Sequence, residues 1–307
     1  MIFIDEEQYA RPYKTAVALG LFDGVHRGHQ KVIGQAVARK SADIKPAVFT
    51  FKTDSVTSKG HDGRIEMILT DEEKCRHFEE LGVECLFSPE FSHFKDMSAE
   101  DFVRNVLKGR LNACFAVCGE DFRFGHKAEG DAEMLKTLGA EYGIQVCVVG
   151  QLSLHGNAVS STEIRRFIRS GDISKANEML GYKYGYSLPV EHGFERGRTW
   201  NFPTINQAIP KGLVMPTFGV YCSKVTIDCR KYIGVTNIGV KPTVKVETAP
   251  LAETYIIGYE GDLYGKTVPI ELYEFVRAER TFESFDELKA EIARNTEFTK
   301  RYFECEC

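Results

Sequence analysis

Apolar residues in the first part of the chain alternate between short continuous runs and stretches with helical spacing. Residues 30–40 and 69–81 carry apolar positions three and four apart, a spacing that predicts helices. The continuous runs have strand length and lie at residues 16–19, 46–51, 83–87, 113–119 and 144–149. Strands that alternate with helices build parallel sheets with a ligand crevice at the strands' carboxyl ends. The pattern therefore predicts a Rossmann-like α/β domain.

Capping residues support this division into elements. Thr70 is followed three residues later by Glu73, which is the spacing of a capping box and predicts a helix start. Two further helices are predicted over residues 159–169 and 176–180, and Gly181 ends the second of them. These two helices are expected to link the two halves of the chain.

The pattern changes near residue 184. From there helical spacing fades, and short β-like runs stand between glycine and proline turns, at residues 186–190, 219–225, 232–238, 253–259 and 267–275. Such runs predict a small antiparallel barrel or sandwich. Residues 284–303 then predict a terminal helix, with Ser284 as its N-cap. We expect two domains, over residues 1–182 and 183–307.

The strand at residues 16–19 runs into a stretch rich in glycine and histidine. Gly20, Gly24 and Gly28 allow tight turns and close approach to a ligand, and the first helix follows. A helix N-terminus suits phosphate, and the imidazoles of His26 and His29 can donate hydrogen bonds to it and stabilise charge as a P–O bond breaks. The alternatives are two polar surface residues or half of a metal site. A Walker loop is excluded because Gly-Lys-Ser/Thr is missing.

Composition narrows the class of protein. The chain has 307 residues, 43% hydrophobic and 27% charged, which is ordinary for a soluble two-domain protein. A net charge of −5 gives no footprint for nucleic-acid binding, and no apolar run approaches the roughly 20 residues of a membrane span. Nine scattered cysteines without metal-ligand spacing indicate reduced thiols. We expect a cytoplasmic protein without nucleic-acid or membrane partners.

The glycine and histidine stretch resembles a known motif. Its letters G-L-F-D-G-V-H-R-G-H, at residues 20–29, contain the H-x-G-H of the nucleotidyltransferase superfamily. In full they resemble the bacterial bifunctional riboflavin kinase/FAD synthetase family. The resemblance implies that His26 and His29 stabilise the transition state of adenylyl transfer. It also implies nucleotide contacts by Gly20, Phe22, Asp23 and Gly24.

Residues 119–125, G-E-D-F-R-F-G, resemble a second motif of this family. Phe122 and Phe124 can wall a flat ring, and Arg123 can bind a phosphate or an internal carboxylate. A packing loop with a structural ion pair is the alternative. The resemblance implies nucleotide contacts by Gly119, Asp121 and Arg123 and a flavin contact by Phe124.

The letters S-S-T-E-I-R at residues 160–165 match the superfamily element that closes over the triphosphate. The resemblance implies nucleotide contacts by Ser160, Ser161, Thr162 and Arg165. Without the resemblance, Ser161 reads as a simple N-cap.

One loop departs from the family. After Phe51 the family usually has Pro-His-Pro, whereas this chain has Thr53, Asp54 and Ser55. The change predicts either an impaired adenylyl transfer or a drifted loop in a site where His26 and His29 suffice.

The second half carries riboflavin kinase motifs. Residues 192–206 resemble G-x-x-x-G-R-x-x-G-F-P-T-x-N, with Asn201 in place of a glycine. Thr204 and Asn206 offer two oxygen ligands on one side of an extended strand, which suits Mg²⁺. The resemblance implies a flap over the nucleotide phosphates that contains Gly193, Gly197 and Arg198.

The match continues toward the C-terminus. Glu253 keeps the family's glutamate, and Tyr255 replaces its usual histidine. The resemblance implies that Glu253 is the general base on the ribityl hydroxyl; the alternative is an exposed strand residue. Asn237 and Arg277 are implied to lie near the flavin, and a structural salt bridge is the alternative for Arg277.

These motifs cover nearly the whole chain in the family's order. They imply an enzyme that phosphorylates riboflavin to FMN with ATP and then adenylylates FMN to FAD, with Mg²⁺ as cofactor. The rivals are an enzyme with kinase activity alone, a flavin-binding regulator and, for the first half only, a transferase for another alcohol phosphate. Small molecules are the expected partners, and the sequence leaves a weak homo-oligomer open.

Overall fold

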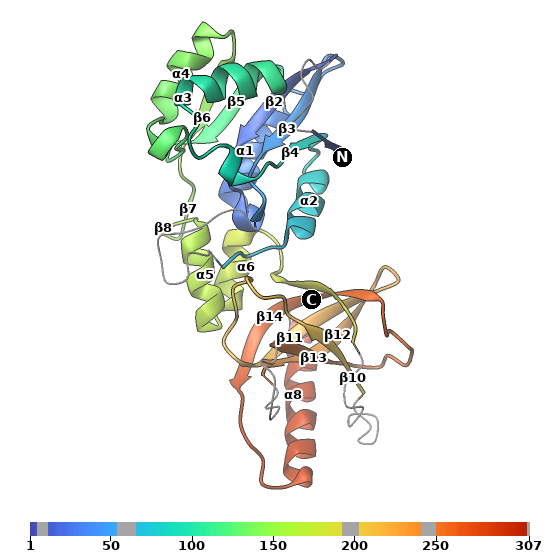
Figure 1. Cartoon of the computed structure of the whole chain (residues 1–307). Helices are drawn as coiled ribbons and strands as arrows, with labels where there is room; N and C mark the ends of the chain where they lie inside the picture. The colour runs from blue at the N-terminus through green and yellow to red at the C-terminus, as the bar shows by residue number, and fades with distance from the viewer. Residues whose placement is uncertain (5–11, 54–65, 192–202, 241–249, 306–307) are drawn as a thin grey trace. The chain divides into compact units, whose positions relative to one another are not determined.

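The structure is a computed structural model that describes residues 1–4, 12–53, 66–191, 203–240 and 250–305. The chain packs as two compact units, Met1–Ser161 and Thr162–Cys307, which are described separately (Figure 1). The predicted boundary between residues 182 and 183 stays a prediction. The two helices that were expected to link the halves pack with the second unit.

The first unit is built on a six-stranded sheet in the order β1-β4-β3-β2-β5-β6, and every pairing in it is parallel. Its strands are β1 (Ile2–Phe3), β2 (Lys14–Leu19), β3 (Ile44–Phe49), β4 (Cys85–Phe87), β5 (Ala113–Gly119) and β6 (Gln145–Val149). The central strands are buried on both faces, as parallel strands covered by helices are. The predicted Rossmann-like parallel sheet is confirmed.

Helices cover this sheet. The α-helices are α1 (Arg27–Val37), α2 (Asp71–Glu80), α3 (Ala99–Asp101) and α4 (Ala132–Glu141), and α3 runs on into a π-helix, Phe102–Arg110. Short 3-10 turns lie at Asp23–Val25, Phe91–His93 and His126–Ala128, and a two-stranded ribbon joins β7 (Ser153–Leu154) to β8 (Asn157–Ala158). The helix expected over residues 30–40 begins earlier, at Arg27, because the side chain of His26 caps it. The capping box of Thr70 and Glu73 is present.

The second unit is a six-stranded antiparallel sheet in the order β10-β13-β12-β11-β14-β9. Its strands are β9 (Gly185–Pro189), β10 (Thr204–Ala208), β11 (Gly219–Ile227), β12 (Arg230–Gly239), β13 (Leu251–Ile256) and β14 (Thr267–Ala278). The sheet curls until its two edges meet, where the N–H of Glu191 donates to the carbonyl of Asn206 at 2.8 Å. The predicted antiparallel barrel is confirmed, and it is nearly closed.

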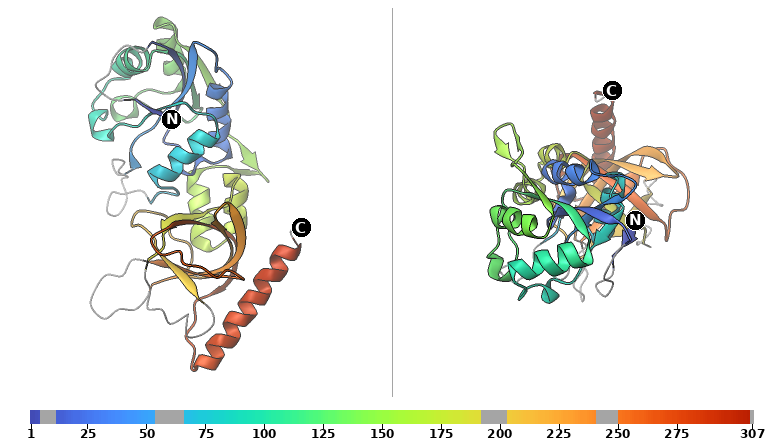
Figure 2. Two further views of the ribbon diagram at one scale, coloured as in Figure 1. Left: turned by 90° about the vertical axis from the view of Figure 1, so that its right-hand side faces the viewer. Right: turned by 90° about the horizontal axis from the view of Figure 1, so that it is seen from above.

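The described helices of this half are α5 (Ser161–Ser170), which begins at the last residue of the first unit, α6 (Ile173–Leu180) and α8 (Phe285–Cys305). Asn177 joins α6 to the barrel, because its amide donates to the carbonyl of Leu272 and accepts from the N–H of Tyr184. The terminal helix α8 lies along the outer wall of the barrel (Figure 2). The ring of Phe303 on this helix packs on Tyr273. Gly181 ends α6 in the left-handed region, as predicted.

Candidate functional site

The loop after β2 is packed tightly beneath the segment that leads into α2. Gly24 has a φ of +75°, and a Cβ there would lie 2.8 Å from Ile68. Asp23 is buried, and its Oδ1 accepts from the N–H of Ile68 at 2.8 Å. The carbonyl of Asp23 also accepts from the hydroxyl of Ser161 at 2.8 Å. The carboxylate of Asp23 therefore fixes the loop that carries the histidines.

The two histidines are stacked at the start of α1. The ring centroids of His26 and His29 lie 3.5 Å apart, with an interplanar angle of 18°. The Nδ1 of His26 accepts from the backbone N–H of His29 at 3.3 Å. Because an accepting Nδ1 carries no proton, His26 holds its proton on Nε2, where it can serve as a donor. The structure brings the predicted pair together at a helix N-terminus, the position that suits phosphate.

His29 is held in its neutral form. Its pKa lies well below the ordinary value of 6.5 because burial disfavours the charged ring, and the charges of His26 and Lys74 lower it further. Its Nδ1 is buried without a hydrogen-bond partner among the described residues. At neutral pH the pair can donate hydrogen bonds to a ligand without adding two positive charges.

Acidification is expected to destabilise the first unit. The unfolded chain takes up a proton at His29 near pH 6.5, and the folded chain takes it up only at lower pH. The stability that comes from this difference is present above pH 6.5 and is lost as the pH falls, by up to about 1.4 kcal/mol per pH unit. The unfolding temperature of the first unit should fall by up to about 3–6 °C per pH unit below 6.5.

Calorimetry from pH 7.5 to pH 5.5 measures this effect. His29→Gln should flatten the slope. His77 on α2 also has a pKa lowered by burial, so His77→Gln measures that separate contribution. An unchanged slope in His29→Gln would show that the ring is not held neutral.

The predicted second motif lies mostly in the core. Phe124 is 7% exposed, and its ring centroid is 5.4 Å from that of Phe102. A Cβ on Gly130 would lie 2.6 Å from the ring of Phe124, so the two pack directly. Phe122 stacks on Phe124 at 5.7 Å and is half-buried, whereas Arg123 is exposed. Of the two phenylalanines, Phe122 is the one better placed to meet a ligand.

The remaining predicted site residues of the first half lie at the end of β5 and around the start of α5. Gly119 ends β5, and Asp121 is exposed in the turn after it. Ser160 and Ser161 belong to the first unit, whereas Thr162 and Arg165 belong to the second. Ser161 is the first residue of α5 and donates its hydroxyl to Asp23, so it is not a simple N-cap.

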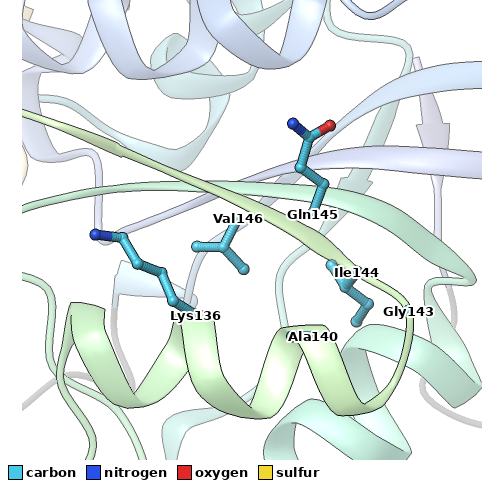
Figure 3. A pocket seen from close by; sticks show the side chains of 6 residues that line it. All are labelled: Lys136, Ala140, Gly143, Ile144, Gln145 and Val146. Carbon is cyan, nitrogen blue, oxygen red and sulfur yellow. The ribbon is translucent and has the colours of Figure 1, made fainter.

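A shallow pocket also lies between α4 and β6 (Figure 3). It is lined by Lys136, Ala140, Gly143, Ile144, Gln145 and Val146. None of these is a predicted site residue, and Lys136 already pairs with Glu133 at 2.7 Å.

In the second unit, strand pairing aligns three predicted residues. Asn206 on β10 is directly opposite Glu253 on β13, and Glu253 is opposite Asn237 on β12. Directly paired residues point to the same face of a sheet, so the three side chains form one row. Thr204, two residues from Asn206, is opposite Tyr255 and extends the row to a second line on that face. The structure therefore gathers Thr204, Asn206, Glu253 and Asn237.

Two charged residues border this row. The amide of Asn237 donates to Oε1 of Glu279 at 3.2 Å. Arg277 lies in a 2.9 Å ion pair with Glu291 of α8, the structural alternative foreseen for it. Burial lowers the pKa of Arg277, and Glu291 opposes this shift. Arg277 therefore anchors α8 at the edge of the row.

Several predictions lie outside the described residues: Asp54, Ser55, Gly193, Gly197, Arg198 and Asn201. Thr53 is described, and its backbone N–H donates to Oδ2 of Asp71 at 3.1 Å. Within the described ranges no group of three His, Cys, Asp or Glu residues could hold a metal ion. Lys74 and Asp71 were not singled out from the sequence. The signal that could have found Lys74 is its position four residues before Phe78 on an amphipathic helix, which places the lysine on the inner face of that helix.

Comparison with known proteins identifies the family. A family model of FAD synthetase matches residues 8–163, and one of riboflavin kinase matches residues 180–303. A Bacillus subtilis (strain 168) protein, named bifunctional riboflavin kinase/FMN adenylyltransferase, is 36% identical over 308 residues, 98% of this chain and 95% of that protein. The chain belongs to the bifunctional riboflavin kinase/FMN adenylyltransferase family.

A further relative and a solved structure are similar to nearly the whole chain. The Escherichia coli (strain K12) bifunctional riboflavin kinase/FMN adenylyltransferase is 33% identical over 94% of this chain and 92% of that protein. A crystal structure described as a macrolide-efflux protein from Streptococcus pneumoniae is 30% identical, with a TM-score of 0.86 and coverage of 98% and 99% of the two chains. In the described part of the present chain, no helix combines the length and apolarity needed to cross a membrane.

Proposed function

We propose that this protein makes both flavin cofactors from riboflavin. The second unit transfers the γ-phosphoryl group of ATP to riboflavin and gives FMN. The first unit transfers AMP from another ATP to FMN and gives FAD and pyrophosphate. The observation that carries the proposal is the row of Asn206, Glu253 and Asn237, because a carboxylate beside candidate metal-binding oxygens suits proton transfer, which flavin binding alone does not need.

Glu253 acts as the general base in the kinase reaction. Its carboxylate takes the proton of the ribityl hydroxyl as that oxygen attacks the γ-phosphorus. The bond between this phosphorus and the bridging oxygen breaks, and ADP leaves with the electron pair. A base in this position contributes typically about 10²–10⁴-fold to the rate.

Thr204 and Asn206 fit a magnesium ion bound together with ATP. Both offer neutral side-chain oxygens at alternate positions of β10, and phosphates and waters complete the shell that Mg²⁺ prefers. When bound, Mg²⁺ neutralises charge on the transferred phosphoryl group. Glu253, opposite Asn206, keeps its role as the base.

In the adenylyltransferase reaction the stacked histidines donate hydrogen bonds to the triphosphate at the N-terminus of α1. A phosphate oxygen of FMN attacks the α-phosphorus, and pyrophosphate leaves with the electrons of the broken P–O bond. Because His29 is held neutral, its ring stabilises the developing charge as a directed hydrogen-bond donor. Within the first unit, Ser160 adds a nucleotide contact in this proposal, and the contacts expected of Thr162 and Arg165 stay predictions.

The match of both family models favours this two-step enzyme over a kinase alone or a regulator. We further infer a cytoplasmic location, which the use of ATP in both steps and the eight unbridged cysteines of the described residues support. That the protein has no nucleic-acid partner stays a prediction, and the formation of a weak homo-oligomer stays open.

Labelled ATP tests the proposal. With riboflavin and Mg²⁺, [γ-³²P]ATP should label FMN, and with unlabelled FMN, [α-³²P]ATP should label FAD. Excess EDTA should abolish the label in FMN, because Thr204 and Asn206 then have no ion to hold against the phosphates. Label from γ-³²P in neither flavin would refute the kinase assignment, and absence of α-³²P from FAD would refute the adenylyltransferase assignment.

A further inference from the structure

Lys74 is a buried lysine that the mechanism above does not use. Its side chain is 2% exposed, and it lies near the N-terminus of α2, where the helix dipole disfavours a cation. Its Nζ makes no hydrogen bond among the described residues. It is 3.2 Å from Oδ1 of Asp71, a carboxylate whose side chain is 43% exposed. An ammonium group without hydrogen bonds is costly to bury, so this position is suited to an incoming anion.

Ring contacts place Lys74 on the side of α2 that faces the histidines. Phe78, one turn further along α2, lies on the same face of the helix. Its ring centroid is 6.0 Å from that of Phe22, and Phe22 meets His29 edge-on at 5.3 Å. The charge of Lys74 is close enough to lower the pKa of His29. Nζ of Lys74 and Nδ1 of His29, two buried nitrogens that find no hydrogen-bond partner in the described part of the chain, therefore belong to one region.

We propose that Lys74 binds the triphosphate of ATP in the first unit, with its ammonium group donating to phosphate oxygens beside His29. The inference rests on the adenylyltransferase function proposed above. The histidines supply directed hydrogen bonds, and Lys74 supplies the fixed positive charge that stabilises a leaving pyrophosphate. In the absence of nucleotide, the carboxylate of Asp71 is the counter-ion of Lys74.

Pyrophosphate inhibition of FAD formation tests this role. Lys74→Met keeps the length of the side chain and removes the charge. It should weaken inhibition by pyrophosphate about 10- to 100-fold and raise the KM for ATP in FAD formation by a similar factor. The KM for ATP in riboflavin phosphorylation, measured on the same preparation, should not change. Lys74→Arg should restore much of the pyrophosphate inhibition.

Controls separate this role from a structural one. Arg76 is exposed on the same helix, so Arg76→Met should leave both reactions as in the wild type. Because an apolar side chain replaces a buried charge, Lys74→Met should not lower the unfolding temperature of the first unit. If pyrophosphate still inhibits Lys74→Met as strongly as the wild type, Lys74 does not bind the triphosphate. A lower unfolding temperature of that variant would then show that Lys74 only pairs with Asp71. Failure of the wild type to form FAD would instead refute the adenylyltransferase assignment.

Discussion

Glu253→Gln should lower the rate of riboflavin phosphorylation by about 10²–10⁴-fold. The amide is nearly isosteric with the carboxylate, so the pairing of Glu253 with Asn206 and Asn237 in the barrel should persist while the proton acceptor is lost. The loss should fall on kcat rather than on the KM for riboflavin, because a base acts in the transition state. Stopped assays that resolve FMN from riboflavin measure both constants.

The same variant carries its own internal control, because FAD formation from added FMN should continue at the wild-type rate. Glu260 is an exposed glutamate beyond β13, so Glu260→Gln is the matched control and should leave the phosphorylation of riboflavin unchanged. A Glu253→Gln protein with wild-type kcat would contradict the role of this carboxylate as the base.

His29→Gln should lower the rate of FAD formation from FMN by about 10²–10³-fold. The substitution removes the ring that stacks on His26 and with it the hydrogen-bond donor proposed for the triphosphate, but it keeps the backbone N–H that donates to the capping side chain of His26. Phosphorylation of riboflavin should remain at the wild-type rate. Chromatography of the flavins formed from FMN and from riboflavin measures the two reactions separately.

His93→Gln is the matched control, since His93 is an exposed histidine of the same unit. It should leave FAD formation unchanged. Equal loss of both reactions in His29→Gln would indicate general misfolding, and full retention of FAD formation would remove His29 from the mechanism.

The sequence predicted the fold well where periodicity and capping determine structure. The strand Ala113–Gly119 was predicted at its observed bounds, and Thr70 and Glu73 form the expected box. The start of α1 was missed because the cap is an imidazole, His26, rather than the usual Ser, Thr, Asp or Asn. The near closure of the barrel depends on contacts between β9 and β10, which spacing along the chain does not encode.

How much of the site could be predicted from the sequence depends on what positions each residue. Local spacing was enough to place Thr204 and Asn206 on one face of β10, but the alignment of Glu253 with Asn237 depends on strand register. The ligand contacts expected of Asp23 and Phe124 stay predictions; in the structure the carboxylate of Asp23 accepts from the N–H of Ile68, and the ring of Phe124 packs on Gly130. Lys74 was missed because its burial arises from the packing of α2, which a sequence pattern shows only weakly.

An end-point flavin assay tests the central claim most directly. Purified wild-type protein is incubated with Mg²⁺ and ATP, in one tube with riboflavin and in another with FMN, and the flavins are resolved chromatographically. We expect FMN and then FAD from riboflavin, and FAD from FMN, because each unit carries its own site. FMN without FAD in both tubes would contradict the two-step account and leave a riboflavin kinase. No new flavin in either tube would contradict the enzyme assignment itself.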